Sequence, residues 1–343
     1  MTETDATAPR EAEVETLTTA DLELPETVRP RMLADFIGQD GLRANLRVFI
    51  DAAKKQGKVL DHTLFFGNPG LGKTTLAQIM ANELGVHLIT TAGPVLERSG
   101  DLAAILTKLE KNDLLFVDEI HRMPIQVEEI LYPAMEDFQL PIVCGTGAAA
   151  RTVQVSVEPF TLVGATTKMG LISSPLRDRF GILHHLEFYT KEDLAAIVQR
   201  TAAILHIQIT PQGALEIGAR SRGTPRIANR FLRRVWDFAL VHGAQTITDL
   251  EASTALFQMG VDSLGLEHMD RKILFVLLNH YNGGPVGLKT LAAASSEEPR
   301  TIEDIYEPFL VHSGLLKRTS RGRVLTDLGR EHVRQFCEDG KLV

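Results

Sequence analysis

A short glycine-rich segment near the start of the chain has the residue types and the spacing to bind a phosphate chain. Gly67–Thr75 reads GNPGLGKTT and fits the pattern GxxxxGK[ST]. Its glycines let backbone N–H groups close around a phosphate at the positive end of the helix that follows. Lys73 adds a charge for the β- and γ-phosphates, and the Thr74 hydroxyl can bind Mg²⁺. A glycine turn without a ligand is the alternative, but the apolar run Thr63–Phe66 before the loop favours a nucleotide.

Two adjacent carboxylates follow another apolar segment. Leu114–Val117 precedes Asp118 and Glu119, so a strand here would deliver both side chains to the carboxyl edge of a sheet, where α/β proteins bind ligands. Asp118 is suited to hold hydrated Mg²⁺, and Glu119 to orient and deprotonate the attacking water. A pair that only caps the following helix is the alternative. Together with the phosphate loop, these carboxylates predict hydrolysis of ATP rather than transfer to a small acceptor.

A hydroxyl and an imidazole lie close to two of the predicted strand ends. Thr166 follows the apolar segment Phe160–Ala165, and its hydroxyl is placed to hold the water between the carboxylates and the γ-phosphate. A routine strand-end threonine is the alternative. His121 comes just after the carboxylate pair. It is either a helix-start residue or a relay that senses the γ-phosphate, and the sequence leaves both open.

Three arginines are candidates for contact with the γ-phosphate. Arg177 and Arg179 flank Asp178 after a Ser-Pro turn, which suits a finger that reaches the nucleotide of a neighbouring subunit. A surface ion pair with Asp178 is the alternative. Thr224–Pro225 predicts a helix start, with an N-cap and a first residue. This start places Arg226 where it can face the nucleotide from a lid.

The segments that would position these side chains alternate between strand and helix patterns from residue 61 to residue 188. Continuous apolar strands in such an alternation indicate a parallel sheet covered by helices on both faces, the fold class of α/β P-loop NTPases. The predicted strands are His62–Phe66, Val86–Thr90, Leu114–Val117 and Phe160–Ala165, and the predicted helices are Thr74–Leu84, Gly100–Leu109 and Val127–Glu136.

After Phe188 the pattern changes to helices separated by Gly, Pro or Thr-Pro, which predicts a small all-helical lid. The lid helices are Lys191–Leu205, Pro211–Ser221, Pro225–His242 and Thr248–Gly260. A third unit has the order of a winged helix-turn-helix, with helices Arg271–Tyr281, Leu288–Ala294 and Thr301–Ser313 and strands Leu315–Arg318 and Arg323–Thr326. We therefore expect a tail at 1–27, an ATPase domain at 28–187, a lid domain at 188–261 and a winged-helix domain at 262–343.

The charge of the chain is unevenly distributed. The net charge is −8, yet residues 1–28 hold eight acidic residues and one arginine, so they carry −7 and the other 315 residues carry −1. A nucleic-acid partner is therefore not excluded, and residues 1–27 are predicted to form an acidic, disordered tail. No apolar run approaches the roughly 20 residues that cross a membrane, and the N-terminus is neither a signal nor a transit peptide. Two distant cysteines, Cys144 and Cys337, argue against a disulfide scaffold and fit a reducing cytoplasm.

A cluster of cations lies on the predicted hairpin of the third unit. Lys317, Arg318, Arg321 and Arg323 occur within seven residues. This density suits contact with DNA phosphates without base specificity. A solvated charged turn is the alternative.

Longer segments resemble the RuvB family of AAA+ ATPases, bacterial motors that drive branch migration of Holliday junctions. The resemblance runs from about Val28 to Arg323 and rests on Gly70–Ala77, Gly100–Leu106, Asp118–Arg122, Leu131–Phe138, Ser174–Gly181, Arg222–Arg230, Gly283–Leu288 and Arg318–Arg323. It implies a DNA-translocating ATP hydrolase with ATP and Mg²⁺ as cofactors. It also implies a hexameric ring that acts in the cytoplasm in DNA recombination, DNA repair and the SOS response to DNA damage.

The resemblance further implies roles for particular residues. The nucleotide contacts are Val28, Arg29, Gly70, Gly72, Lys73, Thr74, Thr75, Glu136, Asp137, Phe138, Arg179, Tyr189 and Arg226, and the metal contacts are Thr74 and, through water, Asp118. With the residues derived above, the catalytic set is Lys73, Asp118, Glu119, Thr166 and Arg179. Arg179 acts in trans on the adjacent subunit, with Arg177 as the second choice. The DNA contacts are Arg318, Arg321 and Arg323.

The segment Ile142–Val155 resembles the hairpin by which the family docks its junction-binding partner, RuvA. Four residues depart from the family pattern: Asn68 and Ala148 replace prolines, Lys168 replaces an arginine after the sensor threonine, and Trp236 replaces a charged residue of the lid. A protein-remodelling AAA+ ATPase and a clamp-loader-like ATP switch on DNA remain the alternatives. The first of these would lack the winged unit and DNA-stimulated turnover.

Overall fold

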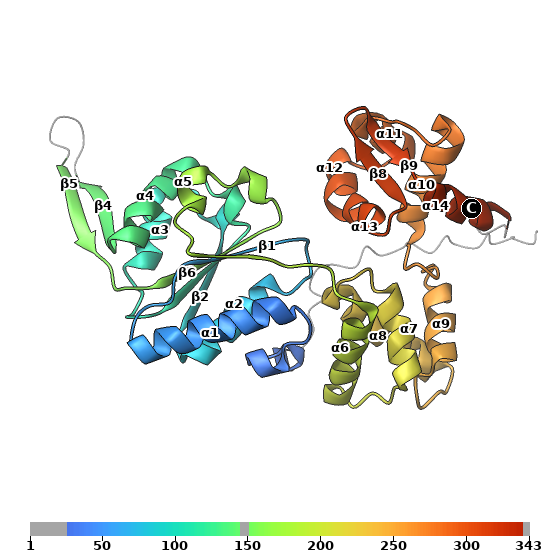
Figure 1. Cartoon of the computed structure of the whole chain (residues 1–343), viewed down its shortest axis with the longest axis horizontal. Helices are drawn as coiled ribbons and strands as arrows, with labels where there is room; N and C mark the ends of the chain where they lie inside the picture. The colour runs from blue at the N-terminus through green and yellow to red at the C-terminus, as the bar shows by residue number, and fades with distance from the viewer. Residues whose placement is uncertain (1–25, 145–150, 339–343) are drawn as a thin grey trace, which may run out of the picture.

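The computed structural model describes residues 26–144 and 151–338. An α/β unit is followed by an all-helical unit and by a third unit of helices with a hairpin, in the order that the sequence predicts (Figure 1). The hairpin tip with Ala148 and most of the predicted tail lie outside the described residues. At the end of that tail, Glu26–Val28 form a short 3-10 turn.

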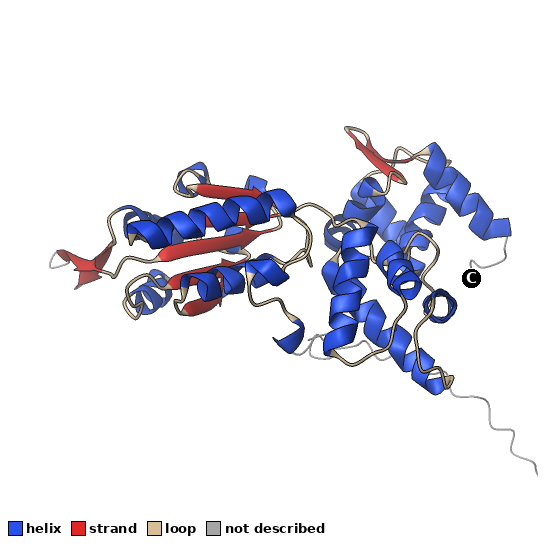
Figure 2. Cartoon of the chain, turned by 60° about the horizontal axis from the view of Figure 1, so that its bottom comes forward, coloured by secondary structure: helices blue, strands red, loops and turns tan. Residues whose placement is uncertain are grey.

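A five-stranded parallel sheet forms the centre of the α/β unit, with the strand order β2-β3-β6-β1-β7. Apolar side chains fill its inner strands because helices cover both faces (Figure 2). Its strands are β1 (Thr63–Phe66), β2 (Leu88–Ala92), β3 (Leu114–Asp118), β6 (Thr161–Thr166) and β7 (Ile182–His185). The predicted sheet is therefore confirmed, with β7 as a further edge strand.

Alternate residues of β3 belong to two hydrophobic cores on opposite faces of the sheet. Leu114 and Phe116 pack into one core, and Leu115 and Val117 pack into the other, as the two-residue period of a strand requires. The flanking helices are α1 (Asp40–Gln56), α2 (Lys73–Leu84), α3 (Ser99–Leu106), α4 (Ile125–Glu136) and the short α5 (Ser174–Arg177). An antiparallel hairpin of β4 (Gln139–Cys144) and β5 (Arg151–Ser156) projects from this unit (Figure 1).

The predicted lid is confirmed as four helices, α6 (Lys191–Ile204), α7 (Pro211–Arg220), α8 (Pro225–Val241) and α9 (Asp249–Gln258). The Thr190 and Thr210 hydroxyls cap their helices by accepting backbone N–H groups. Thr224 occupies the N-cap position of α8, but its hydroxyl makes no capping hydrogen bond and donates instead to the carbonyl of Ser221. Within the described residues, no helix is long and apolar enough to cross a membrane.

The third unit has the predicted winged-helix pattern around its own hydrophobic core. Its helices are α10 (His268–Tyr281), α11 (Leu288–Ser295), α12 (Pro299–Thr301) and α13 (Glu307–His312), with the π-helical turn η8 (Ile302–Tyr306) between the last two. The wing is a hairpin of β8 (Leu316–Thr319) and β9 (Gly322–Leu325). A final helix, α14 (Asp327–Glu338), was not predicted.

The connection between α9 and α10 is ordered by polar contacts. The buried carboxylate of Asp262 accepts the backbone N–H groups two and four residues later and lies 3.0 Å from the ring of His332 on α14. Arg271 of α10 donates to the carbonyls of Gly260 and Leu266, which lie before and after Asp262 in the sequence. These contacts fix the winged-helix unit against the end of the lid.

Candidate nucleotide site

The predicted phosphate loop joins β1 to α2 in a conformation that requires glycine. Gly67 and Gly72 have φ values of +143° and +102°, and a Cβ at Gly67 would lie 2.6 Å from the carbonyl oxygen of Leu186. α2 begins at Lys73, so the first N–H groups of the helix face the loop. Lys73 Nζ donates to the carbonyls of Gly67 (2.7 Å) and Asn68 (2.8 Å). Asn68 therefore contributes a backbone acceptor, which does not depend on its side chain.

Burial changes the acidity of Lys73. The residue is 8 % exposed, and loss of hydration lowers the pKa of its ammonium to about 8, although the nearby Asp118 carboxylate opposes this shift. The Arg226 guanidinium lowers the pKa further. A phosphate chain in the loop would bring negative charge to this ammonium and raise its pKa again. A bound phosphate chain would therefore stabilise the positive charge that the loop and Lys73 gather.

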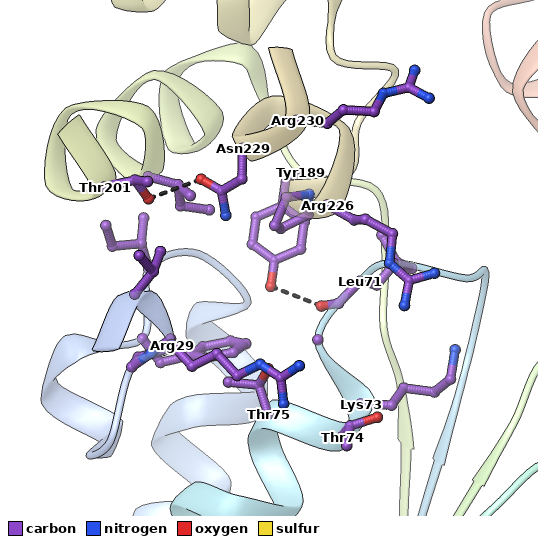
Figure 3. Close-up of a pocket in the computed structure, with 18 of the residues that line it drawn as sticks. Arg29, Leu71, Lys73, Thr74, Thr75, Tyr189, Thr201, Arg226, Asn229 and Arg230 are labelled. Atoms are coloured by element: carbon purple, nitrogen blue, oxygen red, sulfur yellow. Dashed lines mark hydrogen bonds between the residues drawn. The ribbon is translucent and has the colours of Figure 1, made fainter. Parts of the chain in front are cut away.

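The loop forms one wall of a cleft of about 570 Å³, a size typical of small-molecule sites. The other walls come from the end of β3 and from the N-terminal segment and the lid, whose Arg29 and Arg226 are drawn in Figure 3. The predicted residues that line the cleft are Val28, Arg29, Gly70, Gly72, Lys73, Thr74, Thr75, Asp118, Glu119, Tyr189 and Arg226. The fold therefore brings most of the predicted nucleotide contacts around one space.

The lid closes over the loop through a tyrosine and an arginine. The Tyr189 hydroxyl donates to the carbonyl of Leu71 at 3.0 Å (Figure 3), and burial raises the pKa of this phenol, so it stays a donor. Arg226, in the first turn of α8, reaches toward the loop from the lid, and Arg29 lies across the cleft (Figure 3). Arg230, one turn further along α8, points away from the loop (Figure 3).

Several residues of the lining were not predicted: Phe36, Ile37, Arg200, Thr201, Asn229, Arg233 and Arg234. Arg226, Arg230 and Arg233 share one face of α8 by helical spacing, and this pattern was a readable signal. Arg200 donates to the carbonyl of Val28 at 2.8 Å. This contact joins residues that are 172 positions apart, so no local pattern predicts it.

The carboxylate pair lies where β3 leaves the sheet. Asp118 Oδ1 accepts the backbone N–H of Glu119 at 2.8 Å. Glu119 has a φ of +45°, which residues other than glycine seldom adopt, and its carboxylate forms an ion pair with Arg122 at 2.9 Å. The Asp118 carboxylate and the Thr74 hydroxyl both line the cleft. Their oxygen atoms are the kind of metal ligand that Mg²⁺ prefers. The residues present thus fit this ion.

Thr166 lies behind the lining and not on it. The residue is 1 % exposed, and its hydroxyl lies 2.9 Å from Nδ1 of His121 and accepts the backbone N–H of Lys168 at 2.9 Å. The next residue, Thr167, lines the cleft. His121 belongs to a 3-10 turn after the carboxylates, and burial lowers the pKa of its imidazole. His121 itself does not line the cleft, so both its interpretations, as a relay and as a residue of a helical turn, stay predictions.

Arg179 does not line the cleft of its own chain. Its guanidinium pairs with Glu136 at 3.1 Å, donates to the carbonyl of Pro175 at 2.6 Å and lies 4.4 Å from the ring centre of Tyr132. Glu136, with the adjacent predicted contacts Asp137 and Phe138, is likewise not part of the cleft lining. The alternative prediction was an ion pair with Asp178. Arg177 forms this pair, at 3.8 Å. Arg179 and Glu136 thus form a second group, separate from the cleft.

Two of the three arginines predicted to contact DNA form ion pairs within the described part of the winged-helix domain, and the third does not. Arg318 pairs with Glu303 at 2.8 Å and with Glu307 at 3.0 Å, and Arg323, 11 % exposed, pairs with Glu307 at 2.9 Å. Arg321 is exposed at the turn of the wing, with no charged partner among the described residues. A merely solvated turn therefore does not describe Arg318 and Arg323.

Three family profiles match consecutive parts of the chain. They are the Holliday junction DNA helicase RuvB P-loop domain at 28–186, the RuvB AAA lid domain at 189–262 and the RuvB C-terminal winged helix domain at 263–334.

Curated and solved proteins agree with these matches. A Holliday junction branch migration complex subunit RuvB from Nitratidesulfovibrio vulgaris strain DP4 is 67 % identical over 315 residues, which are 92 % of this chain and 98 % of the relative. The subunit of the same name from Paracoccus denitrificans is 60 % identical over 306 residues, which are 89 % of this chain and 90 % of the relative. The structure of the Thermotoga maritima RuvB Holliday junction branch migration motor is 46 % identical, with a TM-score of 0.83 and coverage of 90 % of this chain and 99 % of that one. The chain therefore belongs to the RuvB family of AAA ATPases.

Proposed function

We infer that this protein is an ATP hydrolase that drives branch migration of Holliday junctions in recombination and repair. The observation that supports this most is one cleft that joins a phosphate loop, a carboxylate pair and a lid arginine, in a chain that ends in a winged helix. Relatives that carry the name of branch migration subunits match all three domains. A protein-remodelling ATPase and a clamp-loader-like switch are not favoured, because neither accounts for this complete match. We place the domain boundaries at 28–187, 188–261 and 262–343.

We propose that the residues of the cleft divide the work of hydrolysis. Lys73 and Arg226 neutralise the charge of the phosphate chain, and Glu119 orients and deprotonates the attacking water. Thr166, supported by His121, holds the strand end behind that water. Thr74 and, through water, Asp118 would hold Mg²⁺, which supplies charge neutralisation to the β- and γ-phosphates when it is bound.

We propose that Arg179 completes the site of the adjacent subunit in a hexameric ring. Its separation from the cleft of its own chain supports this assignment over action in cis. Glu136 pairs with Arg179, and we propose that Glu136 and the adjacent Asp137 and Phe138 approach the same neighbouring nucleotide. A ring that shares its active sites couples assembly to turnover.

We propose that the wing contacts DNA phosphates through Arg318, Arg321 and Arg323. Arg321 is free to bind at once, whereas Arg318 and Arg323 must exchange a carboxylate for a phosphate. Replacing Arg321 by Ala should reduce the slope of log affinity against log salt by about one, without changing sequence preference. Replacing the more buried Arg323 should change the slope less and the stability of the wing more.

We propose that this chain acts in the cytoplasm within the SOS response. We also propose that the hairpin of β4 and β5, which spans most of Ile142–Val155, docks a RuvA-like junction-binding protein. The hairpin projects away from the sheet and from the other two domains, which leaves it accessible to a partner (Figure 1). Deleting the residues between its strands should abolish junction processing with the partner and leave the basal ATPase rate unchanged.

A synthetic four-way junction tests the whole assignment. With ATP and the junction-binding partner, the protein should convert the junction into duplex arms, and duplex DNA should raise its ATPase rate. A Glu119→Gln protein is the matched control, since it keeps the fold and the phosphate loop. ATPase activity that is indifferent to DNA would favour a protein-remodelling role, and DNA binding without conversion of the junction would favour a switch.

A further inference from the structure

One helical segment of the winged-helix domain contacts the ATPase domain, the lid and the wing. It runs from α12 through the π-helical turn η8 to α13, and its residues lie on the side of the domain that faces the ATPase sheet (Figure 1). π-Helical turns within helices are rare and occur frequently at functional positions. The acidic residues of η8 and the first residue of α13 pair with cations of the wing and of the ATPase domain.

On one side this segment holds the wing. Glu303 and Glu307, one helical turn apart, bind both arginines that flank the hairpin turn, Arg318 and Arg323. Glu307 is 2 % exposed, so its charge depends on these partners. A phosphate that takes Arg318 away therefore disturbs the charge balance of η8 and α13 directly.

On the other side the same turn holds the ATPase domain. Asp304, adjacent to Glu303, accepts a hydrogen bond from Lys168 Nζ at 2.8 Å, across 136 residues of sequence. The backbone N–H of Lys168 donates to the Thr166 hydroxyl, which in turn contacts His121 at 2.9 Å. A chain of contacts thus leads from a winged-helix carboxylate to the sensor threonine at the end of β6.

Two ring contacts join α13 to the region of the lid, and an ion pair joins the neighbouring helix α10 to the lid. The rings of Phe188, at the junction of ATPase domain and lid, and His312 of α13 lie 4.3 Å apart. Arg222, just before α8, pairs with the fully buried Asp270 through two contacts of 3.0 Å and lies over the Phe309 ring at 4.7 Å. The segment therefore contacts Lys168 just after β6, Phe188 at the junction of ATPase domain and lid, Arg222 of the lid, and the wing.

We propose that Asp304 is a positioning residue for ATP hydrolysis, which acts through Lys168 on Thr166, and that its π-helical turn couples DNA on the wing to nucleotide in the cleft. The proposal rests on the proposed function in one respect, since it takes the wing as the DNA contact. Lys168 is also a departure from the family pattern, and its side chain meets Asp304 as a point charge rather than as a planar fork.

The size of the effect follows from the exposure of the pair. The Lys168 and Asp304 side chains are 39 % and 38 % exposed, and such ion pairs change equilibria by up to about fivefold. Neither residue lines the cleft, so their loss should act on turnover and on coupling more than on nucleotide affinity. Coupling between two binding sites is reciprocal, and the same factor must appear from both sides.

The first test separates positioning from binding. Steady-state ATPase kinetics of Asp304→Asn and Lys168→Ala should show kcat reduced about two- to fivefold and KM within about twofold of the parent. The double variant should be no worse than either single variant, and the exchanged pair Lys168→Asp with Asp304→Lys should recover activity. Asp40→Asn removes an exposed carboxylate paired with Arg43 at 2.9 Å on α1 and is the matched control. An unchanged kcat, or a raised KM alone, would overturn the positioning role.

The second test measures coupling at equilibrium. Duplex DNA affinity is measured with and without a non-hydrolysable ATP analogue, and analogue affinity with and without duplex DNA. The parent protein should give one coupling factor from both directions, and Asp304→Asn should move it toward one by about two- to fivefold. A coupling factor that Asp304→Asn leaves unchanged, or one that equals one in a parent that still processes junctions, refutes the coupling and leaves the proposed function standing. A parent that binds no DNA refutes the proposed function itself.

Discussion

Placement of Arg179 outside the cleft of its own chain leads to a prediction about mixed rings. Arg179→Ala removes a guanidinium that touches Glu136 and Pro175 on the surface of its own domain. Because the Glu136 side chain is 54 % exposed, we expect a stability change of at most about 1 kcal/mol. A finger that stabilises transition-state charge contributes a rate factor of about 10³ to 10⁵, equivalent to roughly 4–7 kcal/mol. Turnover should therefore collapse while nucleotide binding stays nearly intact.

The decisive assay mixes two inactive proteins. A Glu119→Gln subunit lacks the base but offers a normal Arg179, and an Arg179→Ala subunit has the base but no finger. At each interface where the second type holds the nucleotide and the first type supplies the finger, both groups are present. Random rings from equal amounts should recover about a quarter of the parent rate if interfaces act independently.

Three outcomes of this mixing experiment would refute the reasoning. Turnover retained by Arg179→Ala alone would show that this residue is not the finger, and Arg177 would be tested next. A mixture as inactive as its two components, with rings shown to exchange subunits, would place Arg179 in cis. Loss of nucleotide binding by Arg179→Ala would assign it to the ground state instead of the transition state.

Three further predictions concern single sites. Glu119→Gln should bind ATP with near-parent affinity and hydrolyse it at least about 100-fold more slowly; normal turnover, measured as phosphate release, would mean that another residue activates the water. Because burial lowers the pKa of Lys73 to about 8 and bound phosphates raise it, affinity for a fluorescent ATP analogue should fall above about pH 8, by at most about tenfold per pH unit; constant affinity up to pH 9.5 would contradict this. Arg222→Met should lower the free energy of unfolding by about 3 kcal/mol, because it leaves the buried Asp270 carboxyl without its partner, and a paired Asp270→Leu change should restore most of it; urea denaturation showing a loss under about 1 kcal/mol would contradict this.

Much of the fold follows from patterns that are local in sequence. Continuous apolar strands such as Leu114–Val117 predicted the parallel sheet, because only a strand buried on both faces is apolar throughout. Pro and Gly between amphipathic segments predicted the lid helices. α1 was not predicted, although its buried Leu42, Leu46 and Ile50 have helical spacing. The prediction missed the π-helical turn because no propensity distinguishes it from the α-helix around it.

The candidate site divides in the same way. Residues on the phosphate loop and after β3 were predicted because each belongs to a motif whose spacing is set by one loop or one strand. The ion pairs of Arg179 with Glu136 and of Lys168 with Asp304 were not predicted, since their partners are 43 and 136 residues away. The first pair depends on how elements pack within the ATPase domain and the second on how two domains pack, and neither packing has a local signature in the sequence.

The polar contacts around Asp262 have a mechanical consequence. If a flexible linker joined the two domains, the winged-helix domain would move independently of the lid, and a movement of the lid would not be transmitted to it. Here the buried Asp262 carboxylate and Arg271 hold the connection in one conformation. The lid and the winged-helix domain are therefore joined rigidly. A rotation of the lid would therefore carry the winged-helix domain with it, and the displacement of the wing would grow with its distance from the axis of that rotation.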